Sequence, residues 1–575
     1  MKVESRLPAV VCALMLPLCA LAIWPVAEMG LMDDWSYTKT AQVLAQTGHI
    51  VYNGWATAML GWQIHLGALF IKLFGFSFTA VRLSMLPVAM ATAFLIHRIF
   101  IRCGINQWNA TLGTLTLVLS PLFLPLALSF MSDVPGLFCI VLCLYACLRA
   151  LQANTDRSAI AWLCFAAVSN AIGGTVRQIA WLGVLVMVPS TLWLLRRRPR
   201  FLFAGSILYV ICVAFIFFAH RWFHHQPYSV PEDLIQGRIT IAILANLVSN
   251  MGRLVLEMPL LLLPILLFFI PAVPFSNRRA LRIIAIGGSL CIAFRLVQAL
   301  RHKLLLAPYM IDYITIHGIM DDVSLHSEGP IILNSGIRIL LTVLAEVSLV
   351  CLFAVLLTRK KTPPQSSALS QQISWHQLIV LLGPFTLCYL GLLLPRAFFD
   401  VIWDRYTLSL MLVASIFVLR FYQENIRPRL PAAALVPIAI FAAFGIAGTH
   451  DTFALVRARL AVIDELRAAG VPATAIDGGL EYNGWNQIEL ARYIDDPRIP
   501  VLPGDSFRPF VSESFGVCTP LHIDSFSAVS PRYGMAYDPA ACLGQAAFTQ
   551  VTFRTWLGPR SNTLYIVNIG LPQRK

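Results

Sequence analysis

Long apolar segments recur along most of the chain and alternate with short polar stretches. Each is long enough to cross, as a helix, the roughly 30 Å hydrocarbon core of a bilayer. We expect about thirteen such segments, with bounds near residues 7–27, 80–99, 109–128, 134–152, 158–176, 179–195, 201–219, 254–274, 281–300, 337–358, 376–396, 405–421 and 432–449. The pattern therefore predicts an all-α, polytopic membrane protein with about thirteen transmembrane helices.

Two shorter helical patterns lie between the first two apolar segments. One runs from Trp35 to about Thr47 and is closed by Gly48, a residue type that commonly ends helices. The other, from Gly61 to Phe74, is amphipathic and too short to span a bilayer. We expect this second helix to lie in the membrane interface.

The pattern changes after His450, where apolar runs shorten and glycine, proline, aspartate and asparagine become frequent. We therefore divide the chain into a membrane domain, residues 1–450, and a small soluble α/β domain, residues 451–575. In the second domain we expect a helix over 451–469, a strand over 473–476 and a late strand over 563–567.

Composition and charge narrow the class of protein further. Of 575 residues, 58% are hydrophobic and only 13% are charged, which excludes a soluble globule. The net charge of +14 comes mainly from basic clusters in alternate short loops, as the positive-inside rule expects for the cytoplasmic side. The charge therefore indicates topology and not a nucleic-acid partner. We expect a cytoplasmic N-terminus and, with an odd number of spans, a C-terminus outside.

Two of the 13 cysteines differ from the others in their surroundings. Eleven lie in or beside apolar runs, where cysteine behaves as a small buried hydrophobe. Cys518 and Cys542 lie in the polar C-terminal region, and outside the membrane they can form a disulfide. The cysteine and histidine spacings match no zinc site.

Two adjacent carboxylates, Asp33 and Asp34, follow the first apolar segment. Charges close to membrane depth are costly unless they pair, face water or take part in chemistry. Asp34 precedes the helical pattern that begins at Trp35, so we expect it to cap that helix. The carboxylate of Asp33 is then free, either as a catalytic group or as a solvated loop acid.

Three further charged positions have both a structural and a functional interpretation. Asp133 begins an apolar segment, where it either caps a helix or shares an aqueous cavity with Asp33. Arg177 lies between apolar segments and needs an anion, either an internal carboxylate or a ligand. Arg405 lies beside Tyr406 at an outer boundary, and the pair suits either interface anchoring or a grip on phosphate.

Other polar groups carry less information. His65 on the interfacial helix is suited to acid–base work, although a packed or interfacial histidine is the better interpretation. The loop 301–336 mixes acids, among them Asp312, with histidines and Tyr313 in a spacing that matches no ligand signature, so we favour a solvated loop over a metal site. No cofactor is certain, and a divalent cation stays open.

Taken together, the outer face offers two carboxylates, two arginines and an interfacial helix beside a bilayer. This set suits a substrate with a charged phosphate and a lipid tail. A carboxylate can remove a proton from an acceptor hydroxyl, while fixed arginines stabilise the charge that develops on a departing phosphate.

On three short motifs the chain resembles the GT-C glycosyltransferases, specifically the bacterial branch of glycosyltransferase family 39 that is similar to protein O-mannosyltransferases and to the aminoarabinose transferase of lipid A. The resemblance covers about residues 1–450. The motifs are Asp33-Asp34-Trp35-Ser36-Tyr37, Asp133-Val134-Pro135 and Asp404-Arg405-Tyr406-Thr407-Leu408.

The resemblance implies a polyprenyl-phosphate sugar donor, transfer with inversion to a lipid, glycan or protein acceptor, and a bacterial inner membrane location. It further implies that Asp33 is the catalytic base, that Asp133 positions the acceptor or an optional metal, and that Arg405 and Tyr406 meet the lipid phosphate. Many relatives open the interfacial helix with two prolines, where this chain has Gly61-Trp62. That departure concerns the acceptor pocket more than the chemistry.

Two other function classes need similar features. A transporter or flippase of lipid-linked sugars would also need spans, outer arginines and an amphipathic helix, although broken helices in paired halves would mark it and no such internal repeat is evident. An O-antigen ligase or polymerase would use a lipid diphosphate donor and would usually lack the early acidic pair. A purely structural protein would not need acids and arginines gathered on one face.

Overall fold

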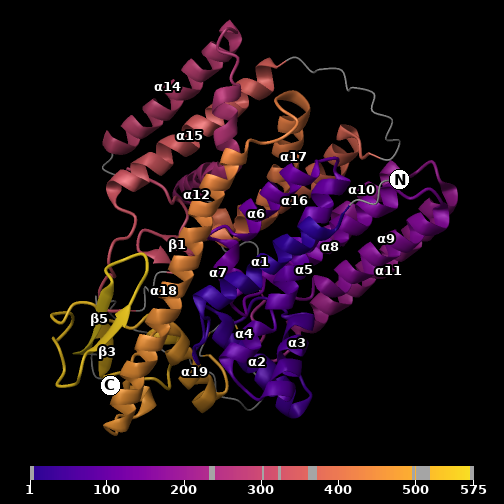
Figure 1. Ribbon diagram of the computed structural model, residues 1–575. Coiled ribbons are helices and arrows are strands. Elements are labelled where there is room, and N and C mark those ends of the chain that lie inside the picture. The colour runs from indigo at the N-terminus through magenta and orange to yellow at the C-terminus, as the bar shows by residue number, and fades with distance from the viewer. Residues whose placement is uncertain are drawn as a thin grey trace.

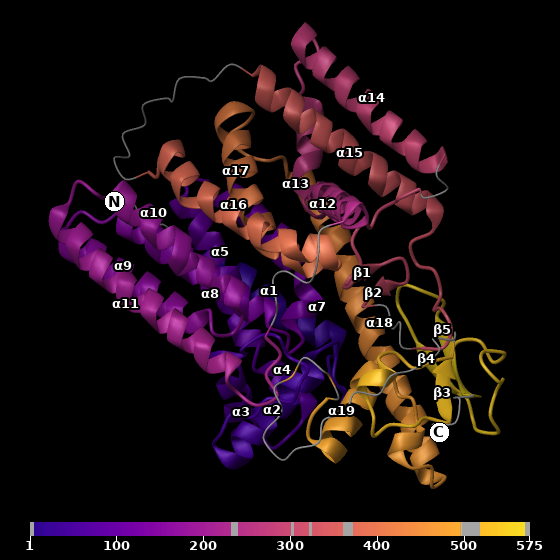
Figure 2. The ribbon, with the colours of Figure 1, turned by 180° about the vertical axis from the view of Figure 1, so that it is seen from behind.

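The structure is a computed structural model that describes residues 5–231, 240–300, 304–320, 325–359, 372–494, 496, 499 and 518–569. Most of this chain is helical, and long helices run from one end of the molecule to the other (Figure 1). Helices α2 (Asp34–Thr47), α3 (Gly61–Phe74) and α19 (Leu480–Ala491) and the C-terminal sheet lie at one end, whereas α14 (Arg278–Leu300) reaches the opposite end (Figures 1 and 2).

Among the described residues, eight helices are long and apolar enough to cross a membrane. They are Phe78–Arg102 (α4 with α5), α8 (Asp133–Leu151), α11 (Pro199–His224), α14 (Arg278–Leu300), α15 (Ser335–Thr358), α16 (Trp375–Phe399), Asp404–Asn425 (a 3₁₀ turn with α17, Leu408–Asn425) and Ala432–Ala468 (a 3₁₀ turn with α18, Leu435–Ala468). A ninth span results if α12 (Ile241–Leu261) is joined to the segment Leu263–Ala272 across its 62° bend. The multi-pass fold is therefore confirmed, and the count of thirteen stays a prediction.

Several expected spans are shorter or broken. Helix α1 covers Leu7–Ile23, α9 covers Asp156–Gly173, and the segment expected over 109–128 is divided into α6 (Gln107–Val118) and α7 (Phe123–Ala127). Pro121 lies in this break, where its missing N–H and its ring prevent a continuous helix. The segment Gln178–Leu194 consists of a 3₁₀ turn, a π turn and α10 (Val188–Leu194).

The two helices expected outside the first span are present. Helix α2 covers Asp34–Thr47 and ends at Gly48, whose φ of 77° is left-handed and therefore suits glycine. Helix α3 covers Gly61–Phe74, the bounds that its amphipathic pattern predicts. A short helix, α4 (Phe78–Leu83), links α3 to α5 (Leu86–Arg102).

The C-terminal region is attached through one continuous helix. Helix α18 runs from Leu435 to Ala468, so the boundary expected at residue 450 falls inside a helix and not at a linker. After it come α19 (Leu480–Ala491) and a three-stranded antiparallel sheet in the order β3-β5-β4, with β3 at Tyr533–Ala536, β4 at Val551–Arg554 and β5 at Ser561–Asn568. A separate two-stranded hairpin joins β1 (Ile314–Thr315) to β2 (Gly318–Ile319).

The two strands predicted in this region have different outcomes. The late strand over 563–567 is confirmed within β5. The prediction of a strand over 473–476 is wrong, because Ala473–Ala475 form a 3₁₀ turn and only Ile476 forms a β-bridge, to Tyr533. Pro472 precedes this turn and pre-sets a turn geometry that the apolar residues alone do not reveal.

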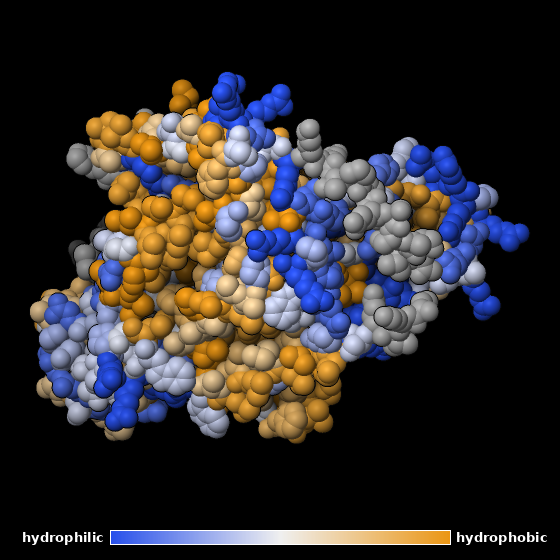
Figure 3. All heavy atoms as spheres, turned by 45° about the horizontal axis from the view of Figure 1, so that its top comes forward, coloured by the Kyte–Doolittle hydropathy of each residue, from blue (hydrophilic) through white to orange (hydrophobic). Residues whose placement is uncertain are grey.

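Figure 3 shows a broad apolar area on one face of the molecule, with hydrophilic side chains most frequent at the upper, right-hand and lower-left edges of the view. The described ends of the chain lie at opposite ends of the helical bundle (Figures 1 and 2).

The structure joins Cys518 to Cys542 by a disulfide across a sequence separation of 24. We predict that both cysteines are oxidised in protein isolated from membranes, and that the bond stabilises the region by roughly 3 kcal/mol because it closes a loop in the unfolded chain. Non-reducing peptide mass spectrometry checks this. Two free thiols would contradict both the bond and an outer location for this region.

Candidate active site

Asp33 lies in the turn between α1 and α2 and immediately precedes α2. It occupies the N-cap position, yet its side chain makes no capping hydrogen bond. Instead, its Oδ1 accepts a hydrogen bond of 2.8 Å from the indole Nε1 of Trp55. Its Oδ2 lies 3.7 Å from Nη2 of Arg405, and 25% of the side chain is exposed. The carboxylate is therefore oriented by an indole and faces a cation.

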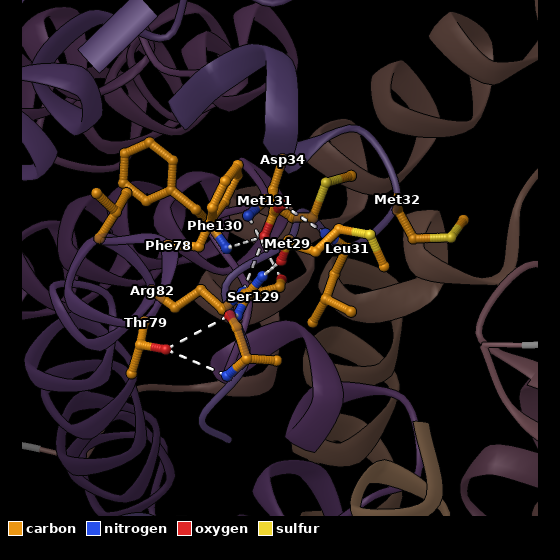
Figure 4. Close-up of polar contacts among 12 residues, drawn as sticks. Met29, Leu31, Met32, Asp34, Phe78, Thr79, Arg82, Ser129, Phe130 and Met131 are labelled. Carbon is orange, nitrogen blue, oxygen red and sulfur yellow. Dashed lines mark hydrogen bonds and ion pairs between the residues drawn. The ribbon is translucent and has the colours of Figure 1, made fainter. Parts of the chain in front are cut away.

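Asp34 has a different role from the one its position predicts. Its Oδ1 accepts a 2.6 Å hydrogen bond from the backbone of Leu31, and its Oδ2 accepts one of 3.1 Å from Phe130 (Figure 4). Nε of Arg82 lies 3.5 Å from Oδ2, and both side chains are buried. Burial raises the pKa of Asp34, whereas Arg82 and the backbone donors oppose this rise. The capping interpretation is wrong: Asp34 ties the turn to Arg82 and to the loop before α8.

Arg82 holds the same turn from α4. Its Nη1 donates a hydrogen bond of 2.8 Å to the carbonyl of Ala27. Its Nη2 donates one to the carbonyl of Met29 (Figure 4). Thr79 bonds the backbone of Ala27 as well. The backbone that leads into Asp33 is thus fixed by buried polar contacts, which suits a group that must keep one orientation.

Arg405 lies in the 3₁₀ turn Asp404–Thr407 and is the cation paired with Asp33. Its Nη1 is 3.3 Å from Oδ2 of Asp312, and only 11% of its side chain is exposed. Nε and Nη1 are buried and have no hydrogen-bond acceptor among the residues that the structure describes. Buried donors without acceptors are costly, and an anion placed beside them would satisfy them.

Three guanidinium groups surround the ring of Tyr406. The distances from the guanidinium carbon to the ring centroid are 4.7 Å for Arg177, 5.3 Å for Arg396 and 5.8 Å for Arg405. Asp133, the first residue of α8, forms an ion pair with Arg177. The internal salt bridge considered for Arg177 is therefore present, and it lies against the same ring as the other two arginines. We call these three arginines with Tyr406 the arginine cluster.

Tyr37 faces the same charges from α2. Burial raises the pKa of its phenol, the negative charge of Asp33 adds to the rise, and Arg405 and Arg177 oppose it. The structure therefore gathers Asp33, Tyr37 and the arginine cluster, with Asp133 joined through Arg177.

Asp312 is a member of the site that the sequence indicated only as one acid in a mixed loop. Its backbone has a φ of 143°, a left-handed value that is strained for a residue with a side chain. Two buried carboxylates hold this loop: Glu257 accepts from the amides of Tyr309 and Met310, and Asp404 from those of Tyr313 and Ile314. Burial raises the pKa of Asp312 to about 6, although Arg405 opposes the rise.

His65 lies outside this group. Its Nδ1 is 3.1 Å from the carbonyl of Gly61, and it lines an apolar cavity of about 540 Å³ between α3, α9 and α11. Neither Asp33 nor Arg405 lines this cavity. An acid–base role for His65 in the same reaction has no geometric support.

Metal ligation also has no geometric support in the described residues, where no three histidine, cysteine, aspartate or glutamate side chains gather. Of the acids in the loop 301–336, Asp321 and Asp322 lie outside the described residues.

Sequence reasoning missed Trp55 and Arg396, and it missed the role of Asp312. Arg396 lies in the last turn of α16 between apolar residues, so a lone cation near the end of a span was the available signal. Trp55 and Asp312 carry no local signal, because their roles depend on partners 22 and 93 positions away, respectively.

Asp33 therefore faces guanidinium groups within a bundle of membrane helices, an arrangement that can hold an anion. Residues 58–223 match the family model of the dolichyl-phosphate-mannose-protein mannosyltransferases. The matched segment includes Asp133 and Arg177, and it confirms the resemblance to GT-C glycosyltransferases that the motifs predict. No curated protein matches the chain by sequence.

Three solved structures show a distant similarity to this chain. The S. cerevisiae protein O-mannosyltransferase Pmt1-Pmt2 complex, bound to its sugar donor, is 13% identical over 39% of this chain and 34% of its own, with a TM-score of 0.32. ArnT from Cupriavidus metallidurans bound to undecaprenyl phosphate is 13% identical over 96% and 97%, with a TM-score of 0.37. Arabinosyltransferase EmbB from Mycobacterium smegmatis is 14% identical over 88% and 45%, with a TM-score of 0.33.

We predict that Asp34→Asn unfolds or strongly destabilises the protein. An amide cannot accept hydrogen bonds from Leu31 and Phe130 on both of its ends. It also removes the carboxylate that interacts most strongly with the buried Arg82. Removing one partner of a buried ion pair costs about 3–5 kcal/mol. Thermal melting of the protein in detergent measures this loss.

The matched control is Asp156→Asn, which breaks the more exposed pair with Arg198 and should change the melting temperature little. Equal melting temperatures for Asp34→Asn and wild type would show that Asp34 does not hold the turn.

Proposed function

We propose that this protein is an integral-membrane glycosyltransferase. It moves a sugar from a polyprenyl-phosphate donor to a lipid, glycan or protein acceptor on the outer face of a bacterial inner membrane, with inversion at the sugar. The observation that carries the proposal is Arg405, which lies beside Asp33 and shares the ring of Tyr406 with Arg177 and Arg396. The family match over residues 58–223 supports the same class of reaction.

The arrangement supports a single displacement. The acceptor oxygen attacks the anomeric carbon, and its proton passes to the carboxylate of Asp33. The bond between the anomeric carbon and the phosphate oxygen breaks with its electron pair on that oxygen. Arg405 and the other members of the arginine cluster stabilise the charge that develops on the departing polyprenyl phosphate. Attack from the face opposite the phosphate inverts the configuration.

The donor site is formed by groups that differ in how tightly they are already paired. Arg177 has Asp133 as its countercharge, and Arg396 lies 3.1 Å from Asp400. Arg405 has two acids near it but two buried nitrogens without acceptors among the described residues. We therefore assign the first contact with the donor phosphate to Arg405, and the support of that contact to Tyr406 and Arg177.

We propose a cytoplasmic N-terminus and a periplasmic C-terminus. The alternate basic loops support this orientation, and so do the opposite positions of the described ends of the chain in the bundle (Figure 1). In this orientation Asp33, Arg405 and the disulfide share the outer side.

We predict that Asp33→Asn abolishes detectable transfer while the protein still folds and binds donor. A general base contributes about 10²–10⁴-fold, and the amide keeps an acceptor for the Trp55 indole. The assay incubates purified protein with polyprenyl-phosphate sugars and follows released polyprenyl phosphate and glycosylated acceptor by mass spectrometry.

The assay separates the rival functions. A transporter would give no transfer with any donor, and a ligase would require a lipid diphosphate donor. Near-normal transfer by Asp33→Asn would contradict its role as base.

Arg405→Lys keeps the charge but not the planar fork, so it should retain more donor binding than Arg405→Ala.

We predict that donor binding weakens as the pH rises through about 6. Asp312 keeps its proton up to that pH, whereas an ordinary aspartate loses it near 4. Above pH 6 the ionised carboxylate competes with the donor phosphate for Arg405. Arg405 keeps its charge throughout this range, and Asp33 is the other acid that faces Asp312.

The measurement is the KM for the polyprenyl-phosphate sugar between pH 5 and 8, with Asp312→Asn as the comparison. The wild-type KM should rise several-fold across this range, and the variant should stay nearly flat. A rise of the same size in both proteins would exclude Asp312 as its source.

A further inference from the structure

The C-terminal region contacts the turn that carries Asp33. Glu481, in the first turn of α19, is buried, and its Oε1 accepts a hydrogen bond of 3.1 Å from the backbone N–H of Met32. Its Oε2 accepts one of 2.8 Å from Nη2 of Arg459 on α18. Arg459 also donates to the carbonyl of Gly478, just before α19. A carboxylate from one region of the chain therefore bonds the residue next to the proposed base in another.

Met32 is the position where such a contact has most effect. Its φ of 53° is left-handed, a conformation that is uncommon for a residue with a side chain and needs support from its surroundings. The next residue is Asp33. Earlier in the turn, the carbonyls of Ala27 and Met29 accept hydrogen bonds from Arg82, the second of which is seen in Figure 4. Glu481 supplies the hydrogen bond at the last amide before Asp33.

A second set of contacts reaches the carboxylate itself. The indole of Trp55, which donates to Asp33, lies 6.2 Å from the ring of Phe526 and 5.4 Å from that of His522, measured between centroids. Trp35, two residues after Asp33, packs against α19 so closely that a Cβ at Gly484 would lie 2.5 Å from its ring. The C-terminal region thus supports both the backbone and the side chain of Asp33.

We infer that Glu481 is a positioning residue for Asp33, and that the docked C-terminal region is part of the catalytic apparatus. The inference rests on the proposed function, because positioning matters only if Asp33 does chemistry. The two oxygens of Glu481 are directed to the turn at Met32 and to Arg459 on α18. Glu481 therefore acts on the geometry of the base and not on donor binding.

The test compares Glu481→Gln with Glu489→Gln in the full-length protein. The amide that Glu481→Gln introduces has one oxygen and one N–H₂ group where Met32 and Arg459 both need an acceptor, so one of the two bonds is lost. Glu489 lies on the same helix and pairs with Lys39 at a more exposed place, so its variant controls for charge loss on α19.

Displacement of a catalytic group by about 1 Å can cost on the order of 100-fold in rate. We expect Glu481→Gln to lower kcat about 10- to 100-fold, with the KM for polyprenyl-phosphate sugar changed less than about twofold. Glu489→Gln should behave as wild type. Glu481→Asp, which keeps both acceptors on a shorter side chain, should recover part of the lost kcat.

Hydrogen exchange of the peptide that contains Met32 and Asp33 supplies a readout that does not need activity. It should be faster in Glu481→Gln than in wild type and unchanged in Glu489→Gln. Unchanged exchange in Glu481→Gln, or a fall in kcat explained entirely by a smaller folded fraction, would overturn the inference. Absence of transfer in the wild-type protein would instead overturn the proposed function. Hydrogen exchange distinguishes the two failures, because it reports on the contact of Glu481 without requiring activity.

Discussion

Asp34 and Arg82 are both buried, so each charge stabilises the other in the protein interior, where an unpaired charge is costly. Each also satisfies backbone groups of the turn between α1 and α2. Asp34 further binds Phe130, in the loop that leads to Asp133 (Figure 4). This ion pair therefore sets the position of Asp33 relative to the start of α8, and the remaining contacts of the site are built on it.

The charges around the site differ in how completely they are paired. Asp133 pairs with Arg177, and Asp400 pairs with Arg396. Arg405 lies between Asp33 and Asp312 and keeps buried donors that no described residue accepts. A phosphate that binds there would supply the missing acceptors at little cost of reorganisation, because the arginines are already in place.

Local sequence patterns predicted the helices well where periodicity alone decides the structure. Helix α3 has the predicted bounds because its apolar face repeats with the helical period, and α2 ends at Gly48 because a left-handed residue closes it there. The prediction of a strand at 473–476 was wrong because Pro472 starts a turn there, in spite of the short apolar run that follows it. The change of composition near residue 450 marks where α18 becomes polar, not a linker.

The candidate site was predictable only as far as each residue carries a local signal. Asp33, Asp133, Arg177, Arg405 and Tyr406 stand out as polar groups beside apolar segments, and the structure brings them together. The role of Asp34 was not predictable, because Phe130 is 96 positions away and outweighs a local capping bond. The support from Glu481 comes from 449 positions away and leaves no local trace.

The most direct test of the account is a structure of the protein in lipid nanodiscs with polyprenyl phosphate added. We expect the phosphate beside Tyr406, with its oxygens about 3 Å from the guanidinium nitrogens of Arg405. The contacts of Arg405 with Asp33 and Asp312 should lengthen as it turns to the phosphate. A phosphate bound in the apolar cavity beside His65, with the arginine cluster unchanged, would contradict the account.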